Sequence, residues 1–226
     1  MSEPAHRFRL IVFDVDGTLV DSQQAIFAAM AAAFAEHGLP APDIAQVRRQ
    51  VGLSVEETMA RLLPAGEEEI RARLAGSFRQ AAFGLRRSPG YSEPLYSGIR
   101  EMLADLAHPQ VFFSIATGKA RRGLDYTLAS HGLADRFHTL QTADRNPSKP
   151  DPAMLLNAMA EVGVAPRETV FVGDTSFDMN MALSAGVSAV GAGWGYHVTE
   201  DLRAAGAQRI IGQPGELPAA LSSMGG

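Results

Sequence analysis

The stretch FRLIVFDVDGT, residues 8–18, decides the fold of this chain. Its apolar, β-branched and aromatic run at 8–13 ends abruptly at Asp14, and an Asp-Gly pair follows at 16–17. A short run of this composition, bounded by turn-forming residues, is typical of a buried strand. The stretch therefore predicts a buried strand that is followed directly by acidic residues.

The same pattern recurs along the chain. Two further clear strands are predicted at 111–116 and 169–172, and weaker ones at 137–141, 187–192 and 209–212. Strands that alternate with helices form a parallel sheet covered on both faces, so we expect an α/β fold with a doubly wound, Rossmann-like core. The helices between the strands are predicted at 98–107, 120–131, 151–162 and 176–185.

One interval interrupts this alternation. Between Asp21 and Arg87 no segment has a convincing strand pattern, and Gly and Pro residues divide the interval into helices. We expect residues 21–87 to form an inserted α-helical cap over the carboxyl end of the sheet, with residues 1–20 and 88–226 as the catalytic core. The cap helices are predicted at 22–37, 43–50, 54–63 and 66–83.

Composition excludes several classes of protein. The chain has 226 residues and no cysteine, which excludes disulfide frameworks, thiolate zinc sites and a cysteine nucleophile. No stretch approaches about 18 uninterrupted apolar residues, and the net charge of −5 argues against broad binding to nucleic acid or anionic membranes. We expect a soluble, cytoplasmic protein with no nucleic-acid or membrane partner; the sequence does not specify its oligomeric state.

Polar side chains gather where the predicted strands end, which is where ligands bind in open α/β sheets. Clustered carboxylates favour a hard cation such as Mg²⁺, and a phosphate beside them needs that cation and an ammonium to offset repulsion. One carboxylate can then attack phosphorus, while a second protonates the leaving oxygen. This set predicts phosphoryl transfer on a small phosphorylated metabolite: Asp14, Asp16, Thr117, Lys149, Asp174 and Asp178.

The segment Asp14-Val15-Asp16-Gly17-Thr18-Leu19-Val20-Asp21-Ser22 resembles the first motif of the haloacid-dehalogenase-like hydrolase superfamily. Thr117, Lys149 and the Gly173-Asp174-x-x-x-Asp178 run are similar to its second, third and fourth motifs, in the same order. The helical insert resembles the superfamily's small α-helical cap. The resemblance covers essentially the whole chain.

The resemblance implies a role for each motif residue. Asp14 is then the nucleophile and a Mg²⁺ ligand, and Asp16 is the general acid/base, which also offers its backbone carbonyl to the metal. Thr117 and the amide of Gly118 hold the phosphoryl oxygens, and Lys149 neutralises charge on the nucleophile and the phosphate.

The fourth motif supplies the remaining metal site. By the same resemblance Asp174 ligates Mg²⁺, and Asp178 supports it or orients Lys149. Capping of the next helix is the simpler interpretation of Asp178. The presence of Asp16 favours phosphate esters over the halides of the dehalogenases, which lack this residue. The cap interval contains no lysine, which excludes the Schiff-base phosphonoacetaldehyde hydrolases.

Within the phosphatases, residues 47–53 and Gly193-Trp194-Gly195-Tyr196 resemble segments of phosphoglycolate phosphatases. In that comparison Arg48 is a candidate for the carboxylate of the substrate, and 2-phosphoglycolate is the leading substrate. Lys119 is expected at the surface or lining the mouth of the site, with phosphate or substrate contact as the alternative. Many phosphoglycolate phosphatases read Thr-Asn-Lys where this chain has Thr117-Gly118-Lys119, so the substrate stays open.

Two other functions remain open from the sequence. A sugar phosphomutase of the same superfamily uses the same two aspartates, and a capped α/β module could sense a phosphorylated ligand without turnover. All predicted catalytic positions are occupied by competent residues, which favours the phosphatase over the sensor.

Overall fold

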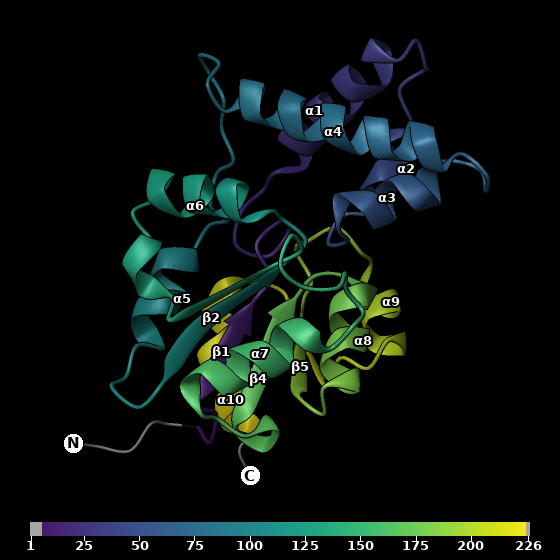
Figure 1. The fold of residues 1–226 in the computed structure, drawn as a ribbon. Coiled ribbons are helices and arrows are strands. Elements are labelled where there is room, and N and C mark those ends of the chain that lie inside the picture. The colour runs from purple at the N-terminus through teal and green to yellow at the C-terminus, as the bar shows by residue number, and fades with distance from the viewer. Residues whose placement is uncertain (1–5, 225–226) are drawn as a thin grey trace.

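The computed structural model describes residues 6–224. Six parallel strands form one sheet in the order β3-β2-β1-β4-β5-β6. The predicted doubly wound α/β fold is therefore confirmed (Figure 1). The strands are β1 (Leu10–Phe13), β2 (Phe112–Thr117), β3 (Thr139–Thr142), β4 (Thr169–Gly173), β5 (Ser188–Ala192) and β6 (Arg209–Ile211).

Strand β1 lies in the interior of the sheet because its residues are apolar toward both faces. Ile11 and Phe13 belong to the apolar cluster on one face, while Leu10 and Val12 belong to the cluster on the other. The chain winds outward from β1 in one direction through β2 and β3, and in the other through β4, β5 and β6. The strand order thus reverses between β1 and β4, which is where doubly wound sheets bind ligands.

Helices cover both faces of the sheet (Figure 1). One apolar cluster contains residues of α5 (Ile99–Asp105), α6 (Arg121–Ser130) and α10 (Leu217–Ser223), and the other contains residues of α7 (Ala153–Val162), α8 (Ser176–Ser184) and α9 (Thr199–Ala204). The sequence did not predict α9 and α10, because each is shorter than two turns and buries only one or two leucines. Three short 3₁₀ helices complete the core: Ala134–Arg136, Pro166–Glu168 and Pro214–Glu216.

The four helices between β1 and α5 lie above the carboxyl edge of the sheet (Figure 1). They are α1 (Gln23–Glu36), α2 (Ile44–Arg48), α3 (Val55–Leu62) and α4 (Glu68–Leu85). Asp43 and Ser54 cap α2 and α3 through hydrogen bonds from backbone N–H groups. The helices share a separate apolar cluster, which includes Met30, Met59 and Leu74. The extent of this helical cap, residues 21–87, stays a prediction. No helix among residues 6–224 is long and apolar enough to cross a membrane.

Leu74 tests whether this cluster stabilises the cap. Its side chain is fully buried, so Leu74→Ala should lower the free energy of unfolding by about 2–5 kcal/mol, from lost apolar burial and the remaining cavity. Leu156→Ala, at a leucine of α7 that is 47% exposed, should change it by less than about 0.5 kcal/mol. Urea denaturation measures both. Equal losses in the two variants would contradict a packed cap core.

Candidate active site

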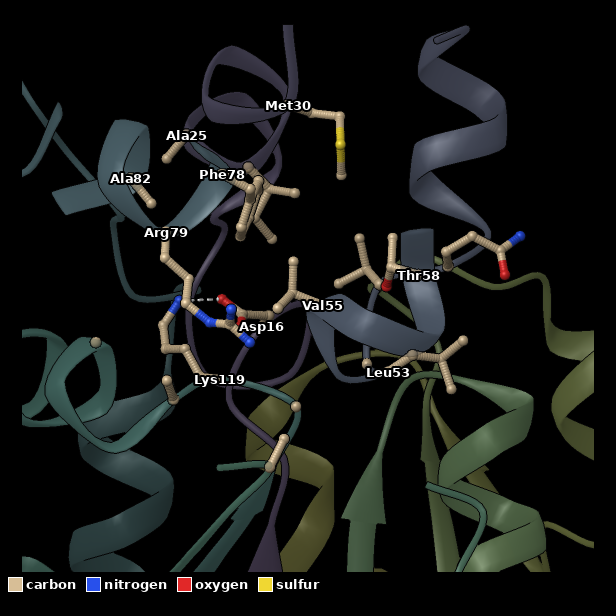
Figure 2. Close-up of a pocket in the computed structure, with 18 of the residues that line it drawn as sticks. Asp16, Ala25, Met30, Leu53, Val55, Thr58, Phe78, Arg79, Ala82 and Lys119 are labelled. Carbon is tan, nitrogen blue, oxygen red and sulfur yellow. Dashed lines mark hydrogen bonds and ion pairs between the residues drawn. The ribbon is translucent and has the colours of Figure 1, made fainter. Parts of the chain in front are cut away.

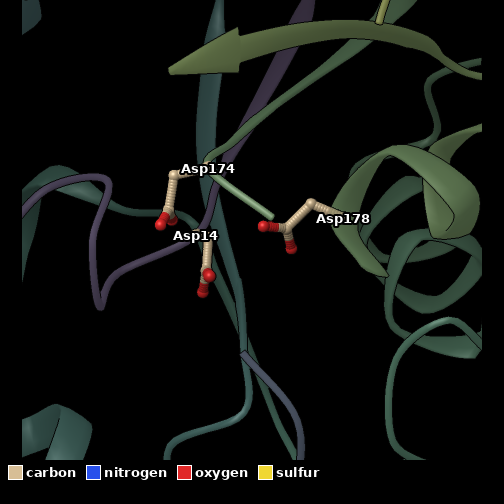
Figure 3. Close-up of side chains that lie close together, drawn as sticks. All are labelled: Asp14, Asp174 and Asp178. Atoms are coloured by element: carbon tan, nitrogen blue, oxygen red, sulfur yellow. The ribbon is translucent and has the colours of Figure 1, made fainter. Parts of the chain in front are cut away.

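Three carboxylates face one another at the switch point of the sheet (Figure 3). Asp14 follows β1, Asp174 follows β4, and Asp178 lies in the first turn of α8. Because β1 and β4 pair in parallel, with Phe13 beside Val172, their carboxyl ends meet. All three side chains are fully buried, and one oxygen from each lies within 4.8 Å of the others.

Asp174 is held by groups from two loops. The Thr18 hydroxyl donates to its Oδ1 at 2.7 Å, and the backbone N–H of Tyr196 donates to its Oδ2 at 2.9 Å. Gly17 and Gly195 approach so closely that a Cβ on either would overlap the Asp174 carboxylate. Gly17 also has a φ of +85°, which glycine adopts at little cost.

Asp178 closes the acidic cluster from α8. Its Oδ2 accepts hydrogen bonds from the backbone N–H and the hydroxyl of Thr175. The backbone N–H of Asp178 donates to the Thr175 hydroxyl oxygen in return, which completes a capping box. Its Oδ1 accepts from the Lys149 ammonium at 2.7 Å. Asp178 therefore both caps α8 and fixes Lys149, so the two interpretations of this residue describe the same geometry.

Lys149 is the buried counter-ion of the cluster. Its Nζ also lies 2.9 Å from Asp14 Oδ1, and the residue is 1% exposed. Burial alone lowers the pKa of an ammonium, but Asp14 and Asp178 outweigh it and raise the pKa of Lys149. The side chain consequently stays positive, between the two carboxylates.

The Asp14 carboxylate is available to a ligand. Apart from the ion pair with Lys149, neither oxygen accepts a hydrogen bond from the part of the chain that the structure describes. The pKa of Asp14 is raised to about 7, because burial and the charges of Asp178 and Asp16 together outweigh the lowering by Lys149. Burial, Asp178 and Asp14 likewise raise the pKa of Asp174. An all-oxygen cluster with unbonded lone pairs and excess negative charge fits Mg²⁺.

Asp16 points away from this cluster and toward a cavity under the cap. Its Oδ1 lies 2.6 Å from the Lys119 ammonium, which also lies 3.3 Å from Glu93 Oε1 (Figure 2). The hydroxyl of Thr127 donates to the other oxygen of Glu93. Lys119 is thus not a surface residue: its side chain is 7% exposed and lines the cavity. Sequence reasoning missed Glu93, because it lies in a loop that follows no strand.

Thr117 is the last residue of β2, and Gly118 follows it directly. Both lie beside the strand end that carries Asp14. Thr117 is fully buried, and Gly118 lines the cavity. A Cβ on Gly118 would overlap the backbone carbonyl oxygens of Gly52 and Leu53 in the cap. This contact explains why the chain departs from the Thr-Asn-Lys pattern: the cap backbone occupies the space that a side chain would need.

The structure places Arg48 outside the residues that line the cavity. Its Nε donates to the carbonyl of Tyr196 and its Nη2 to that of Gly195, both at 3.1 Å. The backbone N–H of Ser54 makes a second link to the core through the Ser148 hydroxyl, at 2.9 Å. In this conformation Arg48 links the cap to the loop that holds Asp174 and does not line the cavity; its contact with a substrate carboxylate stays a prediction.

Fold and site together define a class of protein: a doubly wound α/β protein with a buried carboxylate cluster at the switch point of its sheet and helices above the carboxyl edge of that sheet. Comparison with protein families identifies the family. The model of the haloacid dehalogenase-like hydrolases matches residues 11–192. The chain belongs to this family, which confirms the resemblance found in the sequence.

Individual relatives are similar over most of their length. A Dickeya dadantii protein named "Probable phosphatase IndB" is 34% identical, with 89% of this chain and 88% of the relative covered. A Pseudomonas putida phosphoglycolate phosphatase is 33% identical, with 84% and 71% covered. The crystal structure of a Pseudomonas syringae hydrolase superposes with a TM-score of 0.82 at 26% identity, covering 96% of this chain and 99% of that one. The chain therefore resembles phosphatases of the family.

The pKa of Asp14 predicts pH-dependent metal binding. With a pKa of about 7, Asp14 holds a proton at pH 6 that a divalent cation must displace, whereas at pH 8 the carboxylate is ionised. The apparent affinity for Mg²⁺ should therefore rise at least about tenfold between these values. Calorimetric titration measures it, and Asp14→Asn should reduce the pH dependence to the part that Asp174 contributes. Affinity that is equal at both pH values would contradict the raised pKa.

Metal-free protein should show the opposite trend in stability. The pKa of Asp14 is higher in the folded chain than its unfolded value of about 4, so the folded state binds the extra proton. Its contribution therefore stabilises the fold at low pH and is lost as the pH rises from about 4 to 7. Thermal unfolding with chelator, compared between wild type and Asp14→Asn, measures this contribution.

Gly118 should be required for closure of the cap. Gly118→Ala keeps the backbone amide but introduces a Cβ that overlaps the cap carbonyls, so kcat/KM should fall about tenfold or more. Gly76→Ala, in α4 where a Cβ meets nothing within 4 Å, is the matched control and should retain activity. Steady-state phosphate release measures both, and a fully active Gly118→Ala would show that the closed contact is dispensable.

Proposed function

We propose that the protein is a Mg²⁺-dependent phosphomonoesterase that works through an aspartyl-phosphate on Asp14. The observation that carries this proposal is the buried Asp14 carboxylate, whose oxygens accept no hydrogen bond among the described residues while an ammonium and two further carboxylates surround it. Membership of the hydrolase family and the phosphatase relatives support the same chemistry.

The metal site in this proposal uses the side chains of Asp14 and Asp174 and the backbone carbonyl of Asp16. Mg²⁺, when bound, neutralises charge on the phosphoryl oxygens and so permits an anion to approach the carboxylates. Both carboxylate oxygens of Asp178 already accept hydrogen bonds, one of them from the Lys149 ammonium. In this proposal Asp178 therefore holds Lys149 in place. Thr117, the amide of Gly118 and Lys149 hold the remaining phosphoryl oxygens.

The reaction then has two steps. An Asp14 oxygen attacks phosphorus, the bond from phosphorus to the ester oxygen breaks, and Asp16 protonates the leaving alcohol. In the second step water attacks the same phosphorus, Asp16 takes its proton, and inorganic phosphate and free Asp14 result. Lys119 holds the Asp16 carboxylate through the 2.6 Å contact, on the side of the cavity where the alcohol leaves.

The cap, residues 21–87 in this proposal, excludes bulk water during the first step and opens to release products. The contacts of Arg48, Gly52, Leu53 and Ser54 with the core support a closed state of this kind. The substrate is a small phosphorylated metabolite such as 2-phosphoglycolate, which the relative named phosphoglycolate phosphatase supports.

Asp14→Asn tests the chemistry. Phosphate release from 2-phosphoglycolate and from a generic aryl phosphate should require Mg²⁺, cease with chelator, and fall at least about a thousandfold in the variant, because the nucleophile is lost. Asp125→Asn, at an exposed carboxylate of α6, is the control and should retain full activity.

Two other outcomes would indicate the two alternative functions, the phosphomutase and the sensor. Isomerisation of a hexose 1-phosphate without net phosphate release would indicate the phosphomutase. Tight binding of phosphate esters without any turnover in wild type would indicate the sensor. Activity retained in Asp14→Asn would contradict the aspartyl-phosphate.

A further inference from the structure

The cavity between cap and core has a volume of about 600 Å³. Asp16, Gly118 and Lys119 line its catalytic end. Pockets of about 300–1,000 Å³ bury ligands of drug size, and a water molecule occupies about 30 Å³ in the liquid. The organic part of 2-phosphoglycolate is only two carbons and a carboxylate, so most of this volume would remain filled with water.

The cap side of the cavity is apolar. Figure 2 shows Met30 of α1, Val55 of α3 and Phe78 of α4 around the space above Asp16, with the small side chains of Ala25 and Ala82 beside them. Such a wall favours an apolar ligand group, because filling the space releases water from apolar surface at about 25 cal/mol per Å². These apolar side chains offer a carboxylate or a hydroxyl no hydrogen bond; the polar side chains that the cap adds to the lining are those of Gln50, Glu56, Thr58, Arg79 and Arg86.

The charged side chains of the lining are mostly paired with one another. Lys119 contacts both Asp16 and Glu93, and the Arg79 guanidinium contacts the Glu56 carboxylate. Asp144 accepts a hydrogen bond from a backbone N–H. These six groups, four carboxylates and two cations, therefore carry a net charge of −2.

Two arginines of the lining differ from this pattern. Among residues 6–224, no carboxylate lies within ion-pair distance of Arg86 or Arg122. The Nε of Arg86 is buried without a hydrogen-bond partner, and its guanidinium lies against Gly123, where a side chain would exclude it. Arg122 lies 3.6 Å over the ring of Phe83, which also lines the cavity. Neither guanidinium is in an ion pair, so each can pair with an anion of a ligand, and together they balance the charge of −2 on the other groups of the lining.

We propose that the preferred substrate is a phosphate monoester whose alcohol carries a bulky, apolar body and an anionic substituent. The body fills the cap side of the cavity, and the anion pairs with Arg86 and Arg122. This inference rests on the proposed phosphomonoesterase function and selects among its substrates. Arg86 and Arg122 are specificity-determining residues in it, whereas Arg48 remains a link between cap and core.

Four alkyl esters with similar leaving groups separate size from charge: ethyl phosphate, 2-phosphoglycolate, cyclohexylmethyl phosphate and 4-carboxycyclohexylmethyl phosphate. We expect kcat/KM for the bulky carboxylated ester to exceed that for 2-phosphoglycolate at least tenfold, which is about 1.4 kcal/mol. The bulky neutral ester should also exceed ethyl phosphate. Equal or lower values for the bulky esters would overturn the proposal.

Two pairs of variants test the apolar space and the anion site separately. Ala82→Phe fills the cavity and should reduce the preference for bulky over small esters at least tenfold, whereas Ala72→Phe, at an exposed position of the same helix, should not change it. Arg122→Gln should reduce the preference for the carboxylated over the neutral bulky ester about tenfold. Arg121→Gln is its control, because Arg121 pairs with Asp125 outside the cavity. Unchanged preferences in Ala82→Phe and Arg122→Gln would overturn the assignment.

Binding distinguishes failure of this inference from failure of the proposed function. Calorimetric titration of Asp14→Asn with the same esters measures recognition without turnover. Tighter binding of the bulky carboxylated ester, with no phosphate release in wild type, would support the substrate class and refute the phosphatase. Release from all esters, with no preference in rate or binding, would support the phosphatase and refute the substrate class.

Discussion

Burial of charge at the carboxyl end of β1 is the constraint on which the rest of the structure depends. Asp14, Asp174 and Asp178 are fully buried, and Lys149 is the single ammonium buried among them. Isolated charges are costly in a protein interior unless they are paired and hydrogen-bonded. One ammonium cannot balance three carboxylates, so the pKa values of Asp14 and Asp174 rise and the site favours a proton or a cation.

The loops around this cluster bind Asp174 and approach it closely. Thr18 and the amide of Tyr196 satisfy Asp174, and the glycines at 17 and 195 let the backbone approach it. Arg48 then reaches from the cap to the carbonyls of the same loop. Residues 195 and 196 therefore contact both Arg48 of the cap and Asp174 of the acidic cluster.

Much of the fold was predictable because it depends on local patterns. Strands such as β1 and β4 are continuous apolar runs that end at polar residues, and a pattern of this kind does not depend on the rest of the chain. The short helices α9 and α10 were missed, since fewer than two turns give no readable periodicity. The motif positions Asp14, Asp174 and Asp178 were expected at one edge, and the parallel pairing of β1 with β4 brings them together.

The sequence by itself determined the fold class and the residue types that gather at the sheet edge, because these follow from local order along the chain, and the resemblance of its motifs indicated the family. Tertiary structure alone decided what those residues touch. Lys119 is buried against Asp16 and Glu93, Arg48 binds core carbonyls, and the cap backbone excludes any side chain at Gly118. Each of these contacts joins segments far apart in the chain, and those of Arg48 and Gly118 form only where the cap packs on the core.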